Sequence, residues 1–263
     1  MARTSFGSLS GIRRLAAVPV VAVLLAAGAP ASAQEQSLPG GFTPEQAQGL
    51  EQIIHNYLMQ HPEVLVKSLR AYQQRQERAD AQRQQDAVIA HRRALAGDPD
   101  SPVLGNPEGD VLIVEFFDYR CPYCRRVAGN VRRIVADDGN IRLVMKEFPI
   151  LGPESVRAAR AALAATKQGK YEAYHFALMT APGDMSEAHL KRIAEKVGLD
   201  VARLQRDMEA PEIEESLRRN YALAEALSIN GTPAFVIGDT LVPGAVNLET
   251  LKRLVAEARA KGS

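Results

Sequence analysis

The two cysteines of this 263-residue chain lie together in the tetrapeptide Cys121-Pro122-Tyr123-Cys124, directly after the apolar run 111–117. The run is short and rich in β-branched and aromatic residues, which predicts a buried strand, and Pro122 suits the first position of a following helix. A cysteine at a helix start lies beside unpaired backbone N–H groups and the positive end of the helix dipole, which favour the thiolate. The pattern predicts a redox pair in which Cys121 is the nucleophile and Cys124 the resolving thiol.

Two other uses of such a pair fit the sequence less well. A disulfide between residues three apart closes a very short loop and therefore adds little stability. A zinc site needs four ligands, and the histidines form no closely spaced pair, although the sequence leaves open whether two of them meet in the fold: His55, His61, His91, His175 and His189. We therefore expect redox chemistry with no metal and no cofactor beyond the Cys121–Cys124 disulfide.

The first 33 residues have the pattern of a removable secretory signal. Three arginines precede the apolar stretch 15–29, and Ala31-Ser32-Ala33 forms a small-residue cleavage pattern. The stretch is shorter than the roughly 20 apolar residues that span a bilayer, and no cysteine stands at the cleavage site to carry a lipid anchor. We expect a soluble periplasmic protein that begins near Gln34.

Charge gives no reason to expect a nucleic-acid partner. The predicted signal contains three of the 32 basic residues and none of the 31 acidic ones, so the mature chain would have 29 against 31, a net charge of −2. Nucleic-acid binding proteins usually concentrate an excess of basic residues. We therefore expect no nucleic acid among the partners.

Glu115 is an acidic residue inside the apolar run that precedes the cysteines. An ionised carboxylate is costly to bury among apolar side chains, so its place six residues before Cys121 favours a role in carrying protons for Cys124. The alternative is a carboxylate at the strand end that is either hydrated or paired with a base such as Lys146.

A second motif occurs far downstream, where Asn230-Gly-Thr-Pro-Ala-Phe-Val-Ile-Gly238 places a proline directly before an apolar strand. Pro233 cannot donate a hydrogen bond to a sheet, and X-Pro bonds are those that adopt cis readily, but the spacing does not decide the isomer. On the residues alone, a plain turn remains possible at this point.

Together, the segment Phe116–Cys124 and the segment Gly231–Phe235 resemble the two signatures of the DsbA-like branch of the thioredoxin superfamily. The resemblance covers about residues 101–260 and implies an α/β thioredoxin fold with an inserted helical domain. It also implies that Pro233 is cis, that the Thr232 backbone pairs with a client peptide, and that Glu115 matches the family's buried acid. The substrate-binding set expected from it is Thr232, Pro233, Pro122 and Tyr123.

The stretch between the motifs fits this branch. It begins with a predicted strand at 141–148 and continues with helical patterns at 155–167, 170–179, 186–198 and 213–224. Such a helical insertion, here at about 151–228, is what DsbA-like proteins carry. A hairpin over 235–242 and a closing helix over 248–260 would complete a domain spanning 101–263.

The segment before this domain is helical in pattern but differs in composition along its length. Residues 34–72 carry an apolar face that His61-Pro62 interrupts, and its members are Leu50, Ile53, Ile54, Tyr57, Leu58, Leu65, Leu69 and Tyr72. Residues 73–86 hold six glutamines and three arginines, which predicts a polar helical stalk over 73–100 that ends in Gly97-Asp98-Pro99. The apolar face either docks on its own domain or joins chains. Because the plan resembles ScsC-like, DsbG-like and Com1-type proteins, we favour a homo-oligomer formed through 34–95.

These patterns predict an exported thiol-disulfide oxidoreductase that acts on unfolded or misoxidised exported proteins and depends on a membrane redox partner of unknown identity. Tyr123 stands where the strongest oxidants of the family have histidine, and Thr232 resembles the residue before the proline in isomerase-type members. Both favour an isomerase or reductase over a monomeric dithiol oxidase. From other classes, the alternatives are a copper-binding protein that uses the two thiols as soft ligands, and an envelope holdase.

Overall fold

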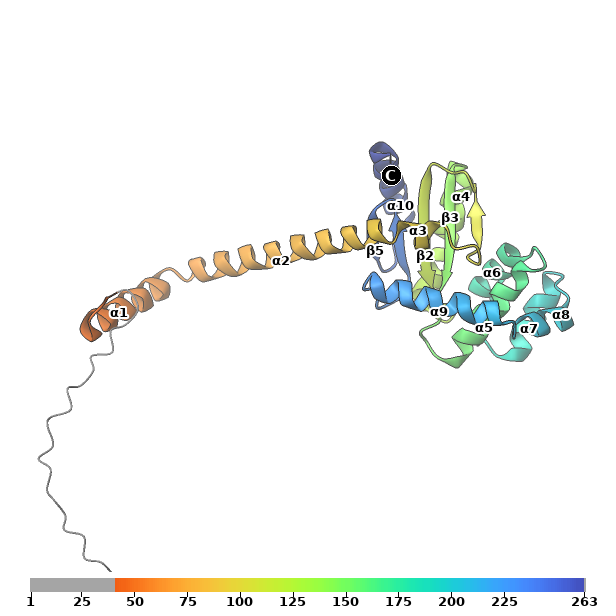
Figure 1. Ribbon diagram of the computed structural model, residues 1–263, viewed down its shortest axis with the longest axis horizontal. Helices are drawn as coiled ribbons and strands as arrows, with labels where there is room; N and C mark the ends of the chain where they lie inside the picture. The colour runs from red at the N-terminus through yellow and green to blue at the C-terminus, as the bar shows by residue number, and fades with distance from the viewer. Residues whose placement is uncertain (1–40, 263) are drawn as a thin grey trace, which may run out of the picture. The chain divides into compact units, whose positions relative to one another are not determined.

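The computed structural model describes residues 41–262, and the predicted signal at 1–33 lies outside them (Figure 1). The chain divides between Val66 and Lys67 into two units. The larger unit contains the sheet, the cysteine pair and the helices of the predicted insertion.

The first unit is dominated by helix α1 (Pro44–Gln60). Thr43 and Gln46 form a capping box in which each side chain accepts a hydrogen bond from the other residue's backbone N–H, at 3.3 and 3.0 Å. The helix ends at His61, because Pro62 follows. None of its residues is buried, so the predicted apolar face is exposed, with Ile53 66% and Tyr57 52% accessible.

Helix α2 (Glu63–Ala90) begins in the first unit and continues into the second. Its polar middle has no buried side chain, as the glutamine-rich composition predicted, and Val88 is its one buried residue. The short helix α3 (Arg92–Ala96) follows and buries Leu95. Val88 and Leu95 pack into a core cluster with Val114 and Phe116 of the sheet, so the packed core includes residues upstream of the predicted boundary at 101.

The sheet has five strands, in the order β1-β3-β2-β4-β5. The apolar run forms the central strand, parallel to β3 and antiparallel to β4, while β1 and β5 pair antiparallel at the two edges. Helix α4 (Pro122–Asp138) connects the two parallel strands, as a crossover must. The strand bounds are β1 (Val103–Gly105), β2 (Val111–Phe117), β3 (Ile141–Glu147), β4 (Ala234–Ile237) and β5 (Thr240–Pro243).

Helices cover both faces of the sheet, and alternation along β2 assigns side chains to each face. Ile113 and Phe117 belong to the larger core cluster with α4, the insertion and α10 (Leu248–Lys261), whereas Val114 and Phe116 face the end of α2, α3 and α9 (Pro211–Ala226). Glu115 shares the parity of Ile113 and Phe117 and therefore points toward the face that α4 covers.

Along the chain, five helices follow β3 and precede β4, and these helices form the insertion (Figure 1). Alanines dominate the buried face of α5, which allows its neighbours to pack closely. The short helix α8 was not predicted; Asp200 begins it by accepting a hydrogen bond from the Arg203 N–H at 2.9 Å. Ser186 stands at the start of α7 as predicted, but its side chain makes no capping bond. The bounds are α5 (Pro153–Thr166), α6 (Tyr171–Thr180), α7 (Glu187–Lys196), α8 (Val201–Asp207) and α9 (Pro211–Ala226).

Two single substitutions to alanine test the packing of α2 and α3 against the sheet. Leu95 is 1% exposed and Ile89 is 51% exposed. We expect Leu95→Ala to lower the free energy of unfolding by about 2–4 kcal/mol, because it leaves a cavity beside β2. The control Ile89→Ala should change it by less than about 0.5 kcal/mol. Urea unfolding followed by circular dichroism measures both, and equal midpoints for the two variants would contradict the packing.

Candidate active site

Cys121 is the N-cap residue of α4, and Pro122 occupies the first helical position, as the tetrapeptide predicted. The Cys121 backbone N–H donates to the Asp118 carbonyl oxygen at 3.1 Å. The Asp118 carboxylate is buried and accepts hydrogen bonds from Arg120 N–H at 2.7 Å, Ser155 hydroxyl at 2.8 Å and Leu151 N–H at 3.0 Å. Asp118 therefore fixes the loop before the cysteine to the start of α5, a role that the sequence did not indicate.

The two sulfurs are unbonded and differ in access to solvent. Cys121 is 4% exposed and Cys124 is fully buried. The Cys121 sulfur lies 3.2 Å from the Thr232 carbonyl oxygen, to which its thiol form donates, and the Thr232–Pro233 bond is cis, as the family resemblance implied. The fold thus brings the two motifs together across 111 positions.

The surroundings separate the acidities of the two thiols. A hydrogen bond from Cys124 is the largest effect on the Cys121 pKa. Together with a bond from the Thr232 side chain, distinct from the Thr232 carbonyl contact, and bonds from the N–H groups of Cys124 and Tyr123, it outweighs burial and lowers the Cys121 pKa to about 5. Burial, followed by that same hydrogen bond, raises the pKa of Cys124 far above its ordinary value. At neutral pH the pair therefore consists of a thiolate at 121 and a thiol at 124.

Glu115 is 2% exposed, and no hydrogen bond from residues 41–262 reaches its carboxyl group. Burial, with a smaller contribution from the Cys121 charge, raises its pKa to about 8. The predicted alternative of an ion pair with Lys146 is wrong, because that ammonium is bound to Asp98 at 3.1 Å and to the Ser101 hydroxyl at 2.8 Å. Glu115 is thus a buried acid that is mostly protonated at neutral pH, and only its ionised form, which becomes populated near pH 8, can accept a proton.

A second buried acid lies beside the loop that leads to Cys121. Glu147, at the end of β3, accepts hydrogen bonds from the hydroxyls of Tyr119 and Tyr171, both at 2.9 Å. The Tyr119 hydroxyl is also 3.0 Å from Nδ1 of His175. Burial raises the pKa of Glu147 well above its ordinary value and lowers that of His175 to about 3, so His175 is neutral at pH 7. The one sequence signal was an acid at the end of a predicted strand, whereas Glu115 drew attention because it lies inside an apolar run.

The residues expected to meet a client surround the Cys121 sulfur on two sides. Pro122 and Tyr123 form the exposed first turn of α4, and the Arg126 guanidinium lies 5.3 Å from the centre of the Tyr123 ring. Thr232 and Pro233 supply the other side. The sequence-predicted set therefore forms one surface around the thiolate.

Two further features of residues 41–262 bear on the alternatives. No group of three or more His, Cys, Asp and Glu side chains in this range is arranged to hold a metal ion. None of the helices within it combines the length and the apolar character that crossing a bilayer requires.

Comparison with known proteins identifies the family. Residues 112–256 match the DSBA-like thioredoxin domain, which is more than half of the chain. The chain belongs to this family. Residues 46–79 match a second family model, the copper resistance protein ScsC N-terminal domain, and this places the chain in the ScsC-like group of DsbA-family oxidoreductases.

Two solved structures cover different shares of the chain. A thioredoxin-like oxidoreductase from Silicibacter pomeroyi is 56% identical over 64% of this chain and 98% of its own, with a TM-score of 0.63. A linker-deletion mutant of Proteus mirabilis ScsC is 27% identical over 85% of this chain and all of its own, with a TM-score of 0.66. Both structures therefore resemble this chain across the thioredoxin-like domain, and the first is a thioredoxin-like oxidoreductase.

The curated relatives are longer proteins. The Na⁺/H⁺ antiporter NhaA 3 of Salinispora tropica is 31% identical over 61% of this chain, and the chain spans a quarter, 25%, of its length. The similarity is therefore to one part of that protein.

The relay role of Glu115 is testable through the release step. In a mixed disulfide between glutathione and Cys121, attack by Cys124 should speed up as pH rises through about 8, because the Glu115 carboxyl then loses its proton and can accept one. We expect Glu115→Gln to slow release by at least about tenfold and to flatten this rise. Stopped-flow measurement of glutathione release provides the readout, with exposed Glu108→Gln as the control. Equal rates and pH profiles in all three proteins would end the relay hypothesis.

Proposed function

We propose that this oxidoreductase reduces and rearranges disulfides in exported proteins through a mixed disulfide at Cys121. The observation that supports this most strongly is the separation of the two thiol acidities beside the Thr232 carbonyl oxygen. A thiolate attacks, while a protonated, buried neighbour does not compete for the client. The proposal places Tyr123 and the Thr232–Pro233 loop against the client peptide.

The proposed reaction proceeds by two exchanges. The Cys121 thiolate attacks one sulfur of a client disulfide, so a Cys121–client bond forms and the other client sulfur leaves as a thiolate. Cys124 then passes its proton to a base, which we propose is the Glu115 carboxylate, and attacks Cys121. This second exchange forms the Cys121–Cys124 disulfide and releases a reduced client. When a client thiol attacks first instead, the client leaves with a rearranged disulfide and the enzyme stays reduced.

Replacing the resolving thiol tests the proposed intermediate. We expect Cys124→Ala to accumulate a covalent adduct with a disulfide-scrambled client protein, because the release step is missing. The matched variant Cys121→Ala should accumulate none, since Cys124 is fully buried. Mass spectrometry under non-reducing conditions counts the adduct. An adduct in the second variant and none in the first would reverse the proposed roles.

We also propose export to the periplasm and recharging by a membrane redox partner. The support for export is the leader pattern at 1–33 and the lack of any cysteine outside the reactive pair. In an oxidising compartment, a chain without further cysteines can use both thiols for exchange, because no other cysteine of the chain can pair with them wrongly.

The proposed assembly is a homo-oligomer formed through residues 34–95. The apolar face of α1 is exposed, and an amphipathic helix gains most of its stability by burying such a face. The match to the ScsC N-terminal domain at 46–79 covers the same part of the chain. Several linked active sites would raise the local concentration of thiolate around one client, which favours repeated attack and therefore isomerisation.

Introducing negative charge on that apolar face tests the assembly. We expect the double variant Ile53→Glu, Tyr57→Glu to have the mass of a single chain by light scattering, while the wild type has a multiple of it, because ionised carboxylates resist burial. The control, Gln48→Glu with Gln52→Glu, adds the same charge at exposed polar positions and should keep the wild-type mass. Recovery of a scrambled client should fall in the first variant alone, while reduction of a small disulfide stays constant. A wild type of single-chain mass would contradict the proposal.

A further inference from the structure

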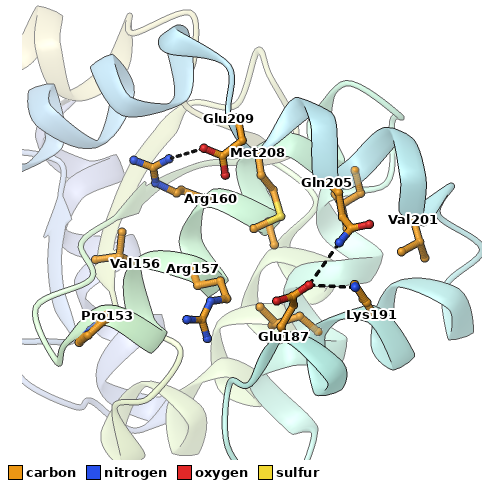
Figure 2. Close-up of a pocket in the computed structure, with 13 residues that line it drawn as sticks. Pro153, Val156, Arg157, Arg160, Glu187, Lys191, Val201, Gln205, Met208 and Glu209 are labelled. Atoms are coloured by element: carbon orange, nitrogen blue, oxygen red, sulfur yellow. Dashed lines mark hydrogen bonds and ion pairs between the residues drawn. The ribbon is translucent and has the colours of Figure 1, made fainter.

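The helical insertion contains a pocket away from the thiols, of about 450 Å³, between α5, α7 and α8 (Figure 2). Its inner lining is apolar and comes from all three helices: Val156, Ala161, Leu190, Val201, Leu204 and Met208. A volume of this size accommodates an organic group of several heavy atoms. The pocket therefore offers burial to an apolar group larger than one methyl.

Charged side chains rim this pocket, and most of them are already paired. Arg160 contacts Glu209 at 3.8 Å and also Glu214. Glu187 contacts Lys191 at 2.9 Å and accepts a hydrogen bond from Gln205 at 3.3 Å. The charges of these groups are already compensated, so they contribute little to binding a charged ligand.

Arg157 differs from the other rim residues. Its guanidinium makes no hydrogen bond or ion pair within residues 41–262, and Figure 2 shows it between Pro153 and Glu187 without a partner. Glu187 is close enough for the Arg157 charge to lower its pKa, but Lys191 and Gln205 already bind that carboxylate. Arg157 is partly exposed, and a guanidinium with five unused donors is a binding group for a carboxylate. The pocket thus fits an apolar group next to a carboxylate.

The location of the pocket favours a polypeptide as the source of these groups. Pro153 lines it and begins α5, and the first turn of α5 is bound to the active-site loop: Ser155 donates to Asp118 at 2.8 Å, and Arg120 pairs with Glu154 at 3.1 Å. Asp118 and Arg120 immediately precede Cys121. The exposed apolar residues Ile150 and Leu151 lie just before Gly152, the N-cap of α5. A client held at Cys121 therefore has a second contact site within reach along α5.

We propose that this pocket binds an apolar segment of the client polypeptide and that Arg157 pairs with an acidic side chain next to that segment. The inference rests on the proposed function for its choice of occupant. It adds a selectivity that the active-site motif does not contain, since clients that carry an apolar–acidic segment would be held at two points. Affinity at the pocket raises the occupancy of Cys121 by such clients without altering the thiols.

The test separates binding from exchange by using the full chain with Cys121→Ser and Cys124→Ser. Fluorescence anisotropy measures binding of three short labelled peptides that differ only at their centre: Leu-Leu-Glu, Leu-Leu-Gln and Ser-Ser-Glu. We expect the first to bind about fivefold to tenfold more tightly than the second, because a partly exposed Arg–carboxylate pair is lost. The third should bind more weakly than both, because it lacks the apolar group.

Variants at Arg157 assign the preference. Arg157→Gln should bind the Leu-Leu-Glu and Leu-Leu-Gln peptides equally, and Arg157→Lys should retain part of the preference. Arg206→Gln, an exposed arginine on α8 outside the pocket, should behave like the parent. A preference that survives Arg157→Gln, or no binding of any peptide, overturns the proposal. Binding of decanoate that depends on Arg157, without binding of the peptides, overturns the assignment to a polypeptide in favour of a small apolar acid.

The intact thiols supply an independent readout. With both cysteines present, Arg157→Gln should reduce kcat/KM about fivefold for a disulfide client that contains Leu-Leu-Glu and leave kcat/KM for oxidised glutathione unchanged. An equal loss for both substrates would place Arg157 in general folding and overturn its selective role. Peptide binding to the cysteine-free protein is independent of exchange, so failure of the proposed redox function and failure of the pocket give different results.

Discussion

The negative charge on the Cys121 sulfur is the feature on which the remaining structure depends. A hydrogen bond from Cys124 stabilises it most, and the first turn of α4 adds backbone N–H groups, so the Cys121 pKa falls to about 5 despite burial. The loop that presents this sulfur is fixed at one end by β2 and at the other by the Asp118 contacts to α5. Opposite it, the Thr232 carbonyl oxygen restricts the direction from which a client can approach.

Burial of acids around this thiolate serves the chemistry because it keeps competing charges away. Glu115 and Glu147 both lie where ionisation is unfavourable, so burial raises the pKa of Glu115 to about 8 and that of Glu147 well above its ordinary value. A second carboxylate charge beside Cys121 would oppose its ionisation. The two sites differ in their partners: two tyrosine hydroxyls bind Glu147, whereas Glu115 is left without such donors and can exchange its proton with less cost.

The parts of this arrangement that depend on local pattern could be predicted from the sequence. The apolar run and Pro122 locate the strand and the start of α4, and the resemblance of the two motifs predicted the cis bond at Pro233 beside Cys121. The three-residue strand β1 gave no signal, since it is too short for a period and its partner β3 is distant in sequence. Lys146 binds Asp98 across 48 positions, and Tyr171 meets Glu147 from the insertion, so neither contact follows from spacing. Sequence alone marked Glu115 as an unusual acid, but it indicated neither Glu147 nor the bases and hydroxyls that surround these acids.

Titration of the Cys121 thiolate in the reduced full chain tests this most directly. Its ultraviolet absorbance should appear with a midpoint near pH 5, and Cys124→Ala should move that midpoint upward, because the largest stabilising hydrogen bond is lost. A midpoint near the ordinary cysteine value of 9.0, or one that Cys124→Ala leaves in place, would contradict the assignment of Cys121 as the stabilised nucleophile.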